Sequence, residues 1–365
     1  MKEYAYHISG TSFSLYPIET HFSLITLADG SNVPMTQQYP FLGPWGGCNV
    51  DEALIRDTIP TPTEITLVYL SIVERKFYAL LLPINALEMD SFFERIEMLK
   101  IDSRPLNLII GMTPYGGVAI WIGCSQKQLL LGWMSTGEIE VDMNEFLQEQ
   151  PNITLEEYCL SHIKENIAVK DNLEKNGLPP RNLFDKYMLQ FTYRYLTLFE
   201  QWDIDKEQWC LDSKSSPKDN QSSQTESNKQ VIEPEFDYIE EALFDGTHDK
   251  LHDNGLMSYH QAGKPKKLAV KWHIKKSEYT AYFWFEDEEI RTIFDRFYGA
   301  HPDTKTDFMI RIDSDNKKFE LALYRYGQKE PQVISESVYQ LLVFKNNFEY
   351  YRSENYNQPK GAWIW

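Results

Sequence analysis

Residues 65–82 have the sequence ITLVYLSIVERKFYALLL, and this stretch decides what kind of fold to expect. Two apolar runs, 65–70 and 77–82, flank the charged segment Glu74-Arg75-Lys76. Runs rich in β-branched and aromatic residues on either side of a polar break are typical of two antiparallel strands joined by a turn. The stretch therefore predicts a β-hairpin.

A helix and a second hairpin are expected directly after it. Asn85 and Glu88 stand in the N-cap and N3 positions of a capping box. An apolar stripe with helical spacing follows, formed by Met89, Phe92, Phe93 and Ile96. Two more strand-like runs, 106–112 and 118–122, surround a turn-forming segment. The predicted order in this half is strand, strand, helix, strand, strand.

The second half of the chain repeats this order. Strand-like runs 268–274 and 279–285 flank Lys275-Lys276, an amphipathic helix follows near residue 290, and the runs 308–312 and 319–324 come next. We therefore expect an α+β protein of two similar lobes, each an antiparallel sheet with packed helices. Internal duplication of a β-β-α-β-β unit explains the repetition; chance recurrence of a common motif is the alternative.

Composition sets the expected domain boundaries. Residues 213–230 contain no apolar residue, which is typical of a flexible linker. We expect an acidic domain over 1–212, the linker over 213–230 and a second domain over 231–365. A helical tail is predicted for the first domain: Asn182 and Asp185 are suited to open a helix that continues to about Gln201.

The negative charge is unevenly distributed. Residues 1–212 carry 15 Lys and Arg against 29 Asp and Glu, a net charge of −14, whereas residues 213–365 carry 21 against 25, a net charge of −4. Such a field repels nucleic acid and anionic membranes and attracts cationic partners. The sequence shows neither a signal-peptide pattern nor a long apolar run, so a cytoplasmic location is expected. The four scattered cysteines are expected to be mainly buried free thiols.

One cluster has residues suited to metal chemistry. His248, Asp249 and His252 provide two imidazoles at i, i+4 and a carboxylate, which would suit Zn²⁺ or Mn²⁺ on a helix. Gly246 and Gly255 instead favour a solvated acidic loop. We expect no metal and no cofactor, and keep the metal site as the alternative.

Two glycine-containing segments could be functional or structural. The segment 111–117, GMTPYGG, lacks the Lys-Ser/Thr of a phosphate-binding loop, so a hairpin turn is expected. The segment 44–48, PWGGC, places Cys48 in a bend, but no histidine lies nearby in the sequence to activate this thiol as a nucleophile.

Two stretches are candidate partner surfaces. Glu138, Glu140 and Asp142 alternate along an acidic run that Glu145 extends, and they form either a one-sided carboxylate face or an ordinary solvated edge strand. The chain end is unusually aromatic. Its residues Arg352, Tyr356 and Trp365 belong either to the core or to an interface.

The segment 62–121 resembles an uncharacterised bacterial domain family, a domain of unknown function. The resemblance is carried by Glu74-Arg75-Lys76-Phe77-Tyr78, by Leu82-Pro83 and by the run that starts at Gly111 and ends at Trp121. It extends from about Tyr16 to Trp202. Members are often lipoproteins, and some resemble immunity partners of toxins delivered by type VI secretion or carried on Rhs proteins. This sequence differs from them in lacking a lipobox cysteine.

The resemblance implies a non-enzymatic immunity protein that acts in interbacterial competition. Its partner would be a cognate, cationic toxin, whose active site it would occlude. The residues also leave open two alternatives: a metal-dependent hydrolase that uses His248 and His252, and a two-lobed structural adaptor.

Overall fold

The structure of the protein is a computed structural model. It describes residues 2–35, 45–47, 58–100, 104–147, 153–203, 208–210, 234–252, 258–316, 318–325, 327, 330–335, 338–345 and 348–352. These residues form two compact units. Of the described residues, unit 1 contains those up to Leu189 together with Phe244–Asp249, and unit 2 contains those of Gln190–Leu243 and those from Lys250 onward. The division differs from the boundary expected at residue 212, and the predicted linker lies outside the described residues.

The expectation of an α+β protein of two lobes with packed helices is wrong, because the chain is mostly β. Strands supply both layers of each unit, and the helices are short elements at their margins. The apolar runs were correctly predicted to be strands. Several segments between these runs, for which no strand was predicted, also form strands of the sheets.

Unit 1 has two sheets. The first has the order β2-β8-β9-β10, with bounds Tyr6–Ser12, Leu106–Met112, Gly117–Gly123 and Gln128–Ser135. The second has the order β11-β7-β6-β3-β4, with bounds Gly137–Ile139, Lys76–Pro83, Pro62–Ser71, Ile18–Leu27 and Asn32–Val33. A separate two-residue pair joins β1 (Glu3–Tyr4) to β5 (Ile59–Pro60). The predicted hairpin at 65–82 is confirmed, since β6 and β7 pair antiparallel from Glu64↔Pro83 to Ser71↔Lys76.

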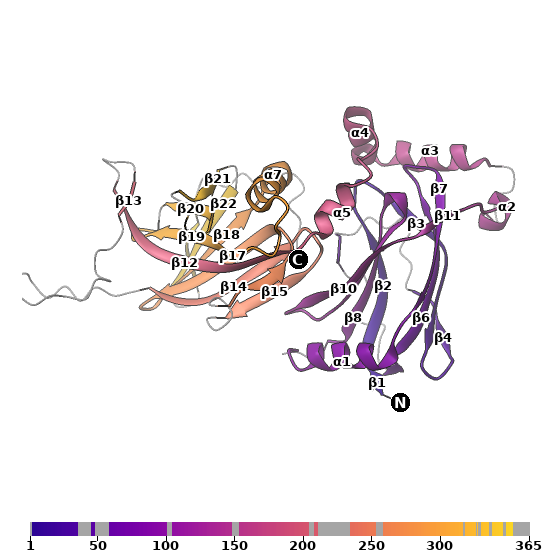
Figure 1. The fold of residues 1–365 in the computed structure, drawn as a ribbon, viewed down its shortest axis with the longest axis horizontal. Coiled ribbons are helices and arrows are strands. Elements are labelled where there is room, and N and C mark those ends of the chain that lie inside the picture. The colour runs from indigo at the N-terminus through magenta and orange to yellow at the C-terminus, as the bar shows by residue number, and fades with distance from the viewer. Residues whose placement is uncertain are drawn as a thin grey trace, which may run out of the picture. The chain divides into compact units, whose positions relative to one another are not determined.

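Alternating residues of the two sheets form the core of unit 1. Ile65, Leu67 and Tyr69 of β6 pack in one cluster with Leu108 and Ile110 of β8. Helix α1 (Ala86–Glu97) lies at one end of the sheets and contributes Met89, Phe93 and Ile96 to the core (Figure 1). Helices α3 (Leu155–Glu165) and α4 (Ile167–Asn176) lie at the opposite end (Figure 1). Two shorter helices, α2 (Met143–Phe146) and α5 (Leu183–Met188), complete the unit.

Unit 2 is also built from two sheets. One has the order β14-β17-β18-β22-β23, with bounds Glu235–Leu243, Pro265–Ile274, Ser277–Trp284, Val338–Lys345 and Phe348–Arg352. The other has the order β13-β12-β19-β20-β21, with bounds Gln208–Cys210, Phe191–Asp203, Thr306–Asp313, Phe319–Tyr324 and Gln332–Ile334. A short strand, β16 (His260–Ala262), pairs with β12, and α7 (Asp287–Tyr298) follows β18. Trp272 joins the layers through ring contacts with Phe199 and Phe319.

One set of strand pairings occurs in both units. In unit 1, β3 pairs with β6, β6 with β7 and β7 with β11, while β2 pairs in parallel with β8. In unit 2, β14 pairs with β17, β17 with β18 and β18 with β22, while β12 pairs in parallel with β19. The first hairpin of each set turns through a basic residue with positive φ, Arg75 at 60° and Lys275 at 57°. Equivalent positions of the two units can therefore be compared.

The predicted helix from Asn182 to about Gln201 is wrong beyond its first turns. Helix α5 ends at Met188, and Phe191–Asp203 is the long strand β12. Phe191, Tyr193 and Tyr195 are buried at alternate positions, which is strand periodicity. Parallel pairing with β19 across eight residues stabilises the extended form, and such tertiary pairing overrides a helix-like apolar spacing.

Candidate functional site

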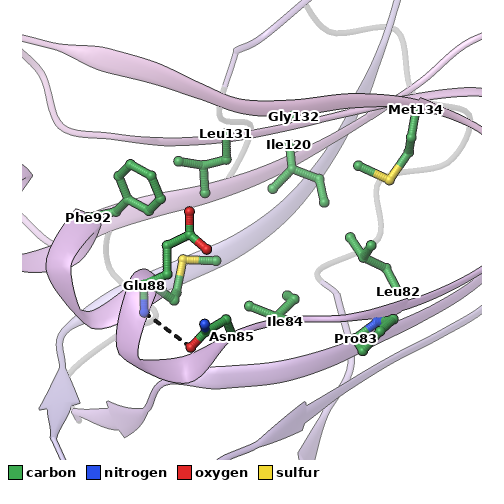
Figure 2. Close-up of a pocket in the computed structure, with 11 residues that line it drawn as sticks. Leu82, Pro83, Ile84, Asn85, Glu88, Phe92, Ile120, Leu131, Gly132 and Met134 are labelled. Carbon is green, nitrogen blue, oxygen red and sulfur yellow. Dashed lines mark hydrogen bonds between the residues drawn. The ribbon is translucent and has the colours of Figure 1, made fainter.

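A hollow of about 280 Å³ opens in unit 1 between the beginning of α1, the end of β7 and the outer part of β10 (Figure 2). We call it the α1–β10 groove. Its lining residues are Leu82, Pro83, Ile84, Asn85, Glu88, Met89, Phe92, Ile120, Leu131, Gly132 and Met134. Most of them are apolar, and Glu88 is the only charged member of this set. A concave apolar surface with a few polar groups is the usual form of a binding site.

A β-bulge shapes the β10 side of the groove. The register against β9 shifts between Leu130 and Gly132, so that Leu131 is the extra residue. Because of this insertion, Leu131, Gly132 and Met134 all line the groove. Bulges are common at sheet edges, where they redirect a side chain.

The beginning of α1 shapes the opposite side. The Asn85 side chain caps the helix by accepting hydrogen bonds from the backbone N–H groups of Leu87 and Glu88, at 3.1 and 3.4 Å. The predicted capping box is only half formed, because the Glu88 carboxylate does not accept a hydrogen bond from the backbone N–H of Asn85. The Glu88 side chain instead points into the groove, on the same side as Phe92 (Figure 2).

The equivalent position of unit 2 is closed. Glu289, three residues after the N-cap of α7, accepts hydrogen bonds from the backbone N–H and the hydroxyl of Ser335, at 2.7 and 3.0 Å. Ser335 directly follows β21, which pairs with β20 as β10 pairs with β9. Within the described part of the chain, no basic side chain lies within ion-pair distance of the Glu88 carboxylate. Unit 1 therefore leaves open a position that unit 2 fills with its own backbone.

The groove suits binding rather than covalent chemistry. Its apolar walls can bury a side chain of another molecule, and its carboxylate can pair with a cationic group next to that side chain. No pattern in the sequence predicted the α1–β10 groove. The one available signal was Glu88, a carboxylate beside an apolar helix stripe, and it was interpreted as a cap residue.

The acidic residues predicted as a partner surface are all exposed. Glu138 lies on β11, where its carboxylate pairs with Lys76 at 2.7 Å. Asp142 accepts a hydrogen bond from the backbone N–H of Asn144 at 2.9 Å and caps α2. Glu140 and Glu145 lie between and after them, also exposed. The run begins at Glu138, three residues after β10 ends at Ser135, so it continues from the strand that forms one wall of the groove.

The histidine cluster lies on a strand, so neither the expected solvated loop nor the helix of the metal-site alternative is found. His248, Asp249 and His252 belong to β15 (His248–His252), so the two histidines are about 13 Å apart along the strand. The imidazole Nε2 of His248 lies 3.0 Å from the carbonyl oxygen of Cys124. Asp249 forms an ion pair with Lys127. Among the residues that the structure describes, no group of three or more His, Cys, Asp and Glu could hold a metal ion.

The turn before β15 is bound within unit 1. The indole N–H of Trp121 donates to the carbonyl oxygen of Asp245 at 3.0 Å. The Gln128 side-chain amide donates to the carbonyl oxygens of Gly46 and Gly246, at 2.8 and 2.7 Å. Gly46, from one of the glycine-containing segments, and Gly246, the glycine before the histidine cluster, thus meet at one point. The contacts are structural, since backbone carbonyls are their acceptors.

The segment GMTPYGG is confirmed as a hairpin turn, between β8 and β9. Within it, Tyr115 has a positive φ of 62°. The Glu74 carboxylate holds this residue by accepting hydrogen bonds from the Tyr115 backbone N–H at 2.6 Å and from the Tyr78 hydroxyl at 3.0 Å. The residues that carry the family resemblance therefore brace two hairpins of unit 1 against each other.

We expect Glu74→Gln to destabilise unit 1 by about 1–3 kcal/mol, because it removes the charge that strengthens the bond to a strained backbone position. Urea unfolding of the full chain measures the change. Glu64→Gln, on β6 of the same sheet, is the matched control and should change the free energy of unfolding by less than about 0.5 kcal/mol. Equal effects of the two substitutions would contradict the brace.

The cysteine prediction is confirmed for the two cysteines whose side chains are described, since Cys124 and Cys159 are buried and free. Burial raises the pKa of the Cys159 thiol to about 12, so this thiol is protonated at neutral pH. Cys48, Tyr356 and Trp365 lie outside the described residues, as do the side chains of Cys210 and Arg352.

None of the helices in the described part of the chain is long and apolar enough to span a membrane. A family model described as a protein of unknown function (DUF2931) matches residues 2–179, which is most of unit 1. No curated protein and no solved structure matches the chain. The expected resemblance to an uncharacterised domain family is confirmed, and the α1–β10 groove lies within the matched segment.

Proposed function

We propose that the protein is a non-enzymatic binding protein and that unit 1 holds a cationic partner protein at the α1–β10 groove. The groove carries this proposal. It is an apolar hollow that contains one carboxylate, that of Glu88, and no described lysine or arginine forms an ion pair with it. The equivalent position of unit 2 is closed by Ser335. An apolar side chain of the partner would fill the hollow, and a basic side chain next to it would pair with the Glu88 carboxylate.

Charge supports the same choice of partner. The first 212 residues carry a net charge of −14, and complementary charge accelerates encounter between proteins. The resemblance to the uncharacterised domain family narrows the class of partner protein. We propose that the partner is a toxin of the type VI or Rhs kind and that the protein acts as its immunity partner. Inhibition would follow from occlusion of the toxin's active site by the bound surface.

Capture from a lysate of the source bacterium tests the proposal. The full-length protein should retain one dominant basic protein, in a ratio near 1:1, that stops growth when it is expressed alone. Co-expression of the full-length chain should restore growth. A captured set made up of housekeeping proteins, or a dominant partner without effect on growth, would count against the immunity role.

The acidic run should act mainly on the rate of association. We expect the triple variant Glu138→Gln, Glu140→Gln, Asp142→Asn to slow association with the captured partner about three- to tenfold at low salt and to leave dissociation nearly unchanged. Asparagine at 142 preserves the cap of α2. Surface-based kinetics at two salt concentrations measure both rates.

A triple variant with the same change in net charge provides the control for that measurement. Glu165, Asp171 and Glu174 are exposed residues of α3 and α4, and their neutral amide forms should slow association less. If both triple variants slow association equally, the total charge acts and the run at 138–142 has no special part.

A further inference from the structure

We infer that β10 is an acceptor strand: the partner adds an extended segment along its outer edge and places alternate apolar side chains in the α1–β10 groove. This inference deepens the proposed function and rests on it, since it states how the partner is held. It also defines the chemistry of the bound segment.

The outer edge of β10 is largely open among the described residues. On its inner side, β10 pairs with β9 from Gln128↔Gly123 to Ser135↔Gly117. On its outer side, the recorded pairing is the single bridge Gln128↔His248. Residues 129–135 thus present a row of backbone donors and acceptors to which another strand can bind.

The composition of β10 lacks the usual protection of an edge strand. Its sequence, QLLLGWMS, contains no charged residue and no proline. Natural edges are usually shortened, charged, covered or twisted by a β-bulge, because an exposed apolar edge pairs with other chains. Strand β10 has the bulge at Leu131 but neither a charge nor a proline. The equivalent strand of unit 2, β21, has only three residues. An eight-residue neutral edge is therefore expected to have a partner in the working state.

A second strand edge faces this one across the groove. Strand β11 pairs with β7 only from Ile139↔Phe77 to Gly137↔Ala79, so no strand of the described part of the chain pairs with residues 80–83 of β7 on that side. Leu82 and Pro83 of β7 and Leu131 and Met134 of β10 line opposite walls (Figure 2). The groove is thus a slot between two strand edges, which suits an extended chain better than a helix.

The slot specifies the bound segment. Seven residues of β10 edge, 129–135, accommodate an extended segment of about 23 Å. In such a segment every second side chain points into the groove and the others point to solvent. Inward residues must be apolar to match Phe92, Ile120 and Leu131. Glu88 lines the groove but is itself exposed, so its carboxylate lies at the rim, where a long solvent-facing lysine or arginine side chain can bend to it. The occupant is therefore a basic, alternating segment of the partner protein.

The test uses the full chain and a synthetic probe, the acetylated and amidated heptapeptide Lys-Val-Lys-Leu-Lys-Val-Lys. We expect it to bind with a Kd on the order of 10 μM by fluorescence anisotropy. The same peptide N-methylated at its central amides keeps its side chains and charge but loses backbone donors, and its affinity should be at least about tenfold lower. A peptide with glutamate in place of lysine tests the charge and should also bind at least about tenfold more weakly.

Hydrogen exchange locates the bound peptide. Backbone amides within 129–135 should exchange more slowly in the presence of the parent peptide, and those of β21 should not change. Equal binding of the N-methylated form, unchanged exchange in β10, or no binding of the parent peptide at 1 mM would each overturn the strand addition. Protection of β10 that rises with the concentration of the protein alone would show pairing between two copies of the chain and would also overturn it.

The two proposals fail in different ways. One outcome is that the capture experiment yields a toxin whose binding needs the groove, while the N-methylated peptide binds as well as its parent or exchange in β10 is unchanged. The binding function then stands and strand addition does not. If the parent peptide binds as a strand but no toxin is captured, the acceptor strand stands and the immunity role does not.

Discussion

Replacing Gly132 with phenylalanine is expected to lower the affinity for the captured partner about hundredfold while leaving the fold unchanged. Gly132 lines the α1–β10 groove between Leu131 and Met134. A phenyl ring at this position would fill a space of about 280 Å³ that we assign to a partner side chain. Loss of one buried anchor of an interface costs about 2–4 kcal/mol, which corresponds to roughly 30- to 1000-fold in affinity.

The backbone tolerates this substitution. Gly132 does not have a positive φ, and a Cβ built on it would lie 3.4 Å from the Cε of Met134, an ordinary contact with the end of a flexible side chain. The melting temperature should therefore change by no more than about 2 °C. Titration calorimetry with the purified partner measures the affinity.

Ile167→Phe is the matched control, because it also places a phenyl ring on an apolar position of unit 1. Ile167 is 72% exposed at the start of α4, far along the chain from the groove residues. Its affinity should remain within about twofold of the unmodified protein. Full binding by the Gly132→Phe variant would show that the partner does not enter the groove.

Trp121→Ala is expected to lower the free energy of unfolding of unit 1 by about 3–5 kcal/mol, the usual cost of removing a fully buried large aromatic side chain. Trp121 has no exposed surface. Its ring meets Trp45 edge-on at a centroid distance of 4.9 Å, and its N–H binds the carbonyl oxygen of Asp245. The alanine variant loses both contacts and leaves a cavity beside Gly111, which has no side chain to fill it.

Urea unfolding monitored by circular dichroism provides the measurement, and Trp121→Phe separates the two contributions. The phenylalanine variant keeps an apolar ring but leaves the Asp245 carbonyl without its donor, so we expect a loss of about 1–3 kcal/mol. A loss below about 1 kcal/mol for the alanine variant would contradict the buried position of this indole and the docking of Phe244–Asp249 in unit 1.

Local patterns in the sequence were sufficient for the hairpin–helix–hairpin blocks. Strands β6 and β7 follow from two apolar runs on either side of Glu74-Arg75-Lys76, and helix α1 follows from a stripe after Asn85. The turn at 113–117 follows from its turn-forming residues. These features are encoded within a few residues, where turn chemistry and apolar periodicity act directly.

The candidate site could be predicted only in fragments. The acidic run at 138–142 was identified and is exposed, but the groove depends on residues of β7, α1, β9 and β10 that are up to 52 positions apart in the sequence. Leu131 joins the lining because of a bulge, and a one-residue register shift has no signature in a single apolar run such as QLLLGWMS. By sequence, Glu88 fits the role of a capping-box residue as well as that of a groove carboxylate.

Local elements, the unequal charge and the likeness to an uncharacterised domain family can all be read from the order of the residues. Contacts between distant segments make Phe191–Asp203 a strand and place Phe244–Asp249 in unit 1. They also leave β10, among the described residues, with one bridge on its outer side, beside a groove. The physical reason is the range of the interactions. Capping, turns and side-chain periodicity act between near neighbours, whereas strand pairing and docking bring together segments whose contact leaves no mark on the residues between them.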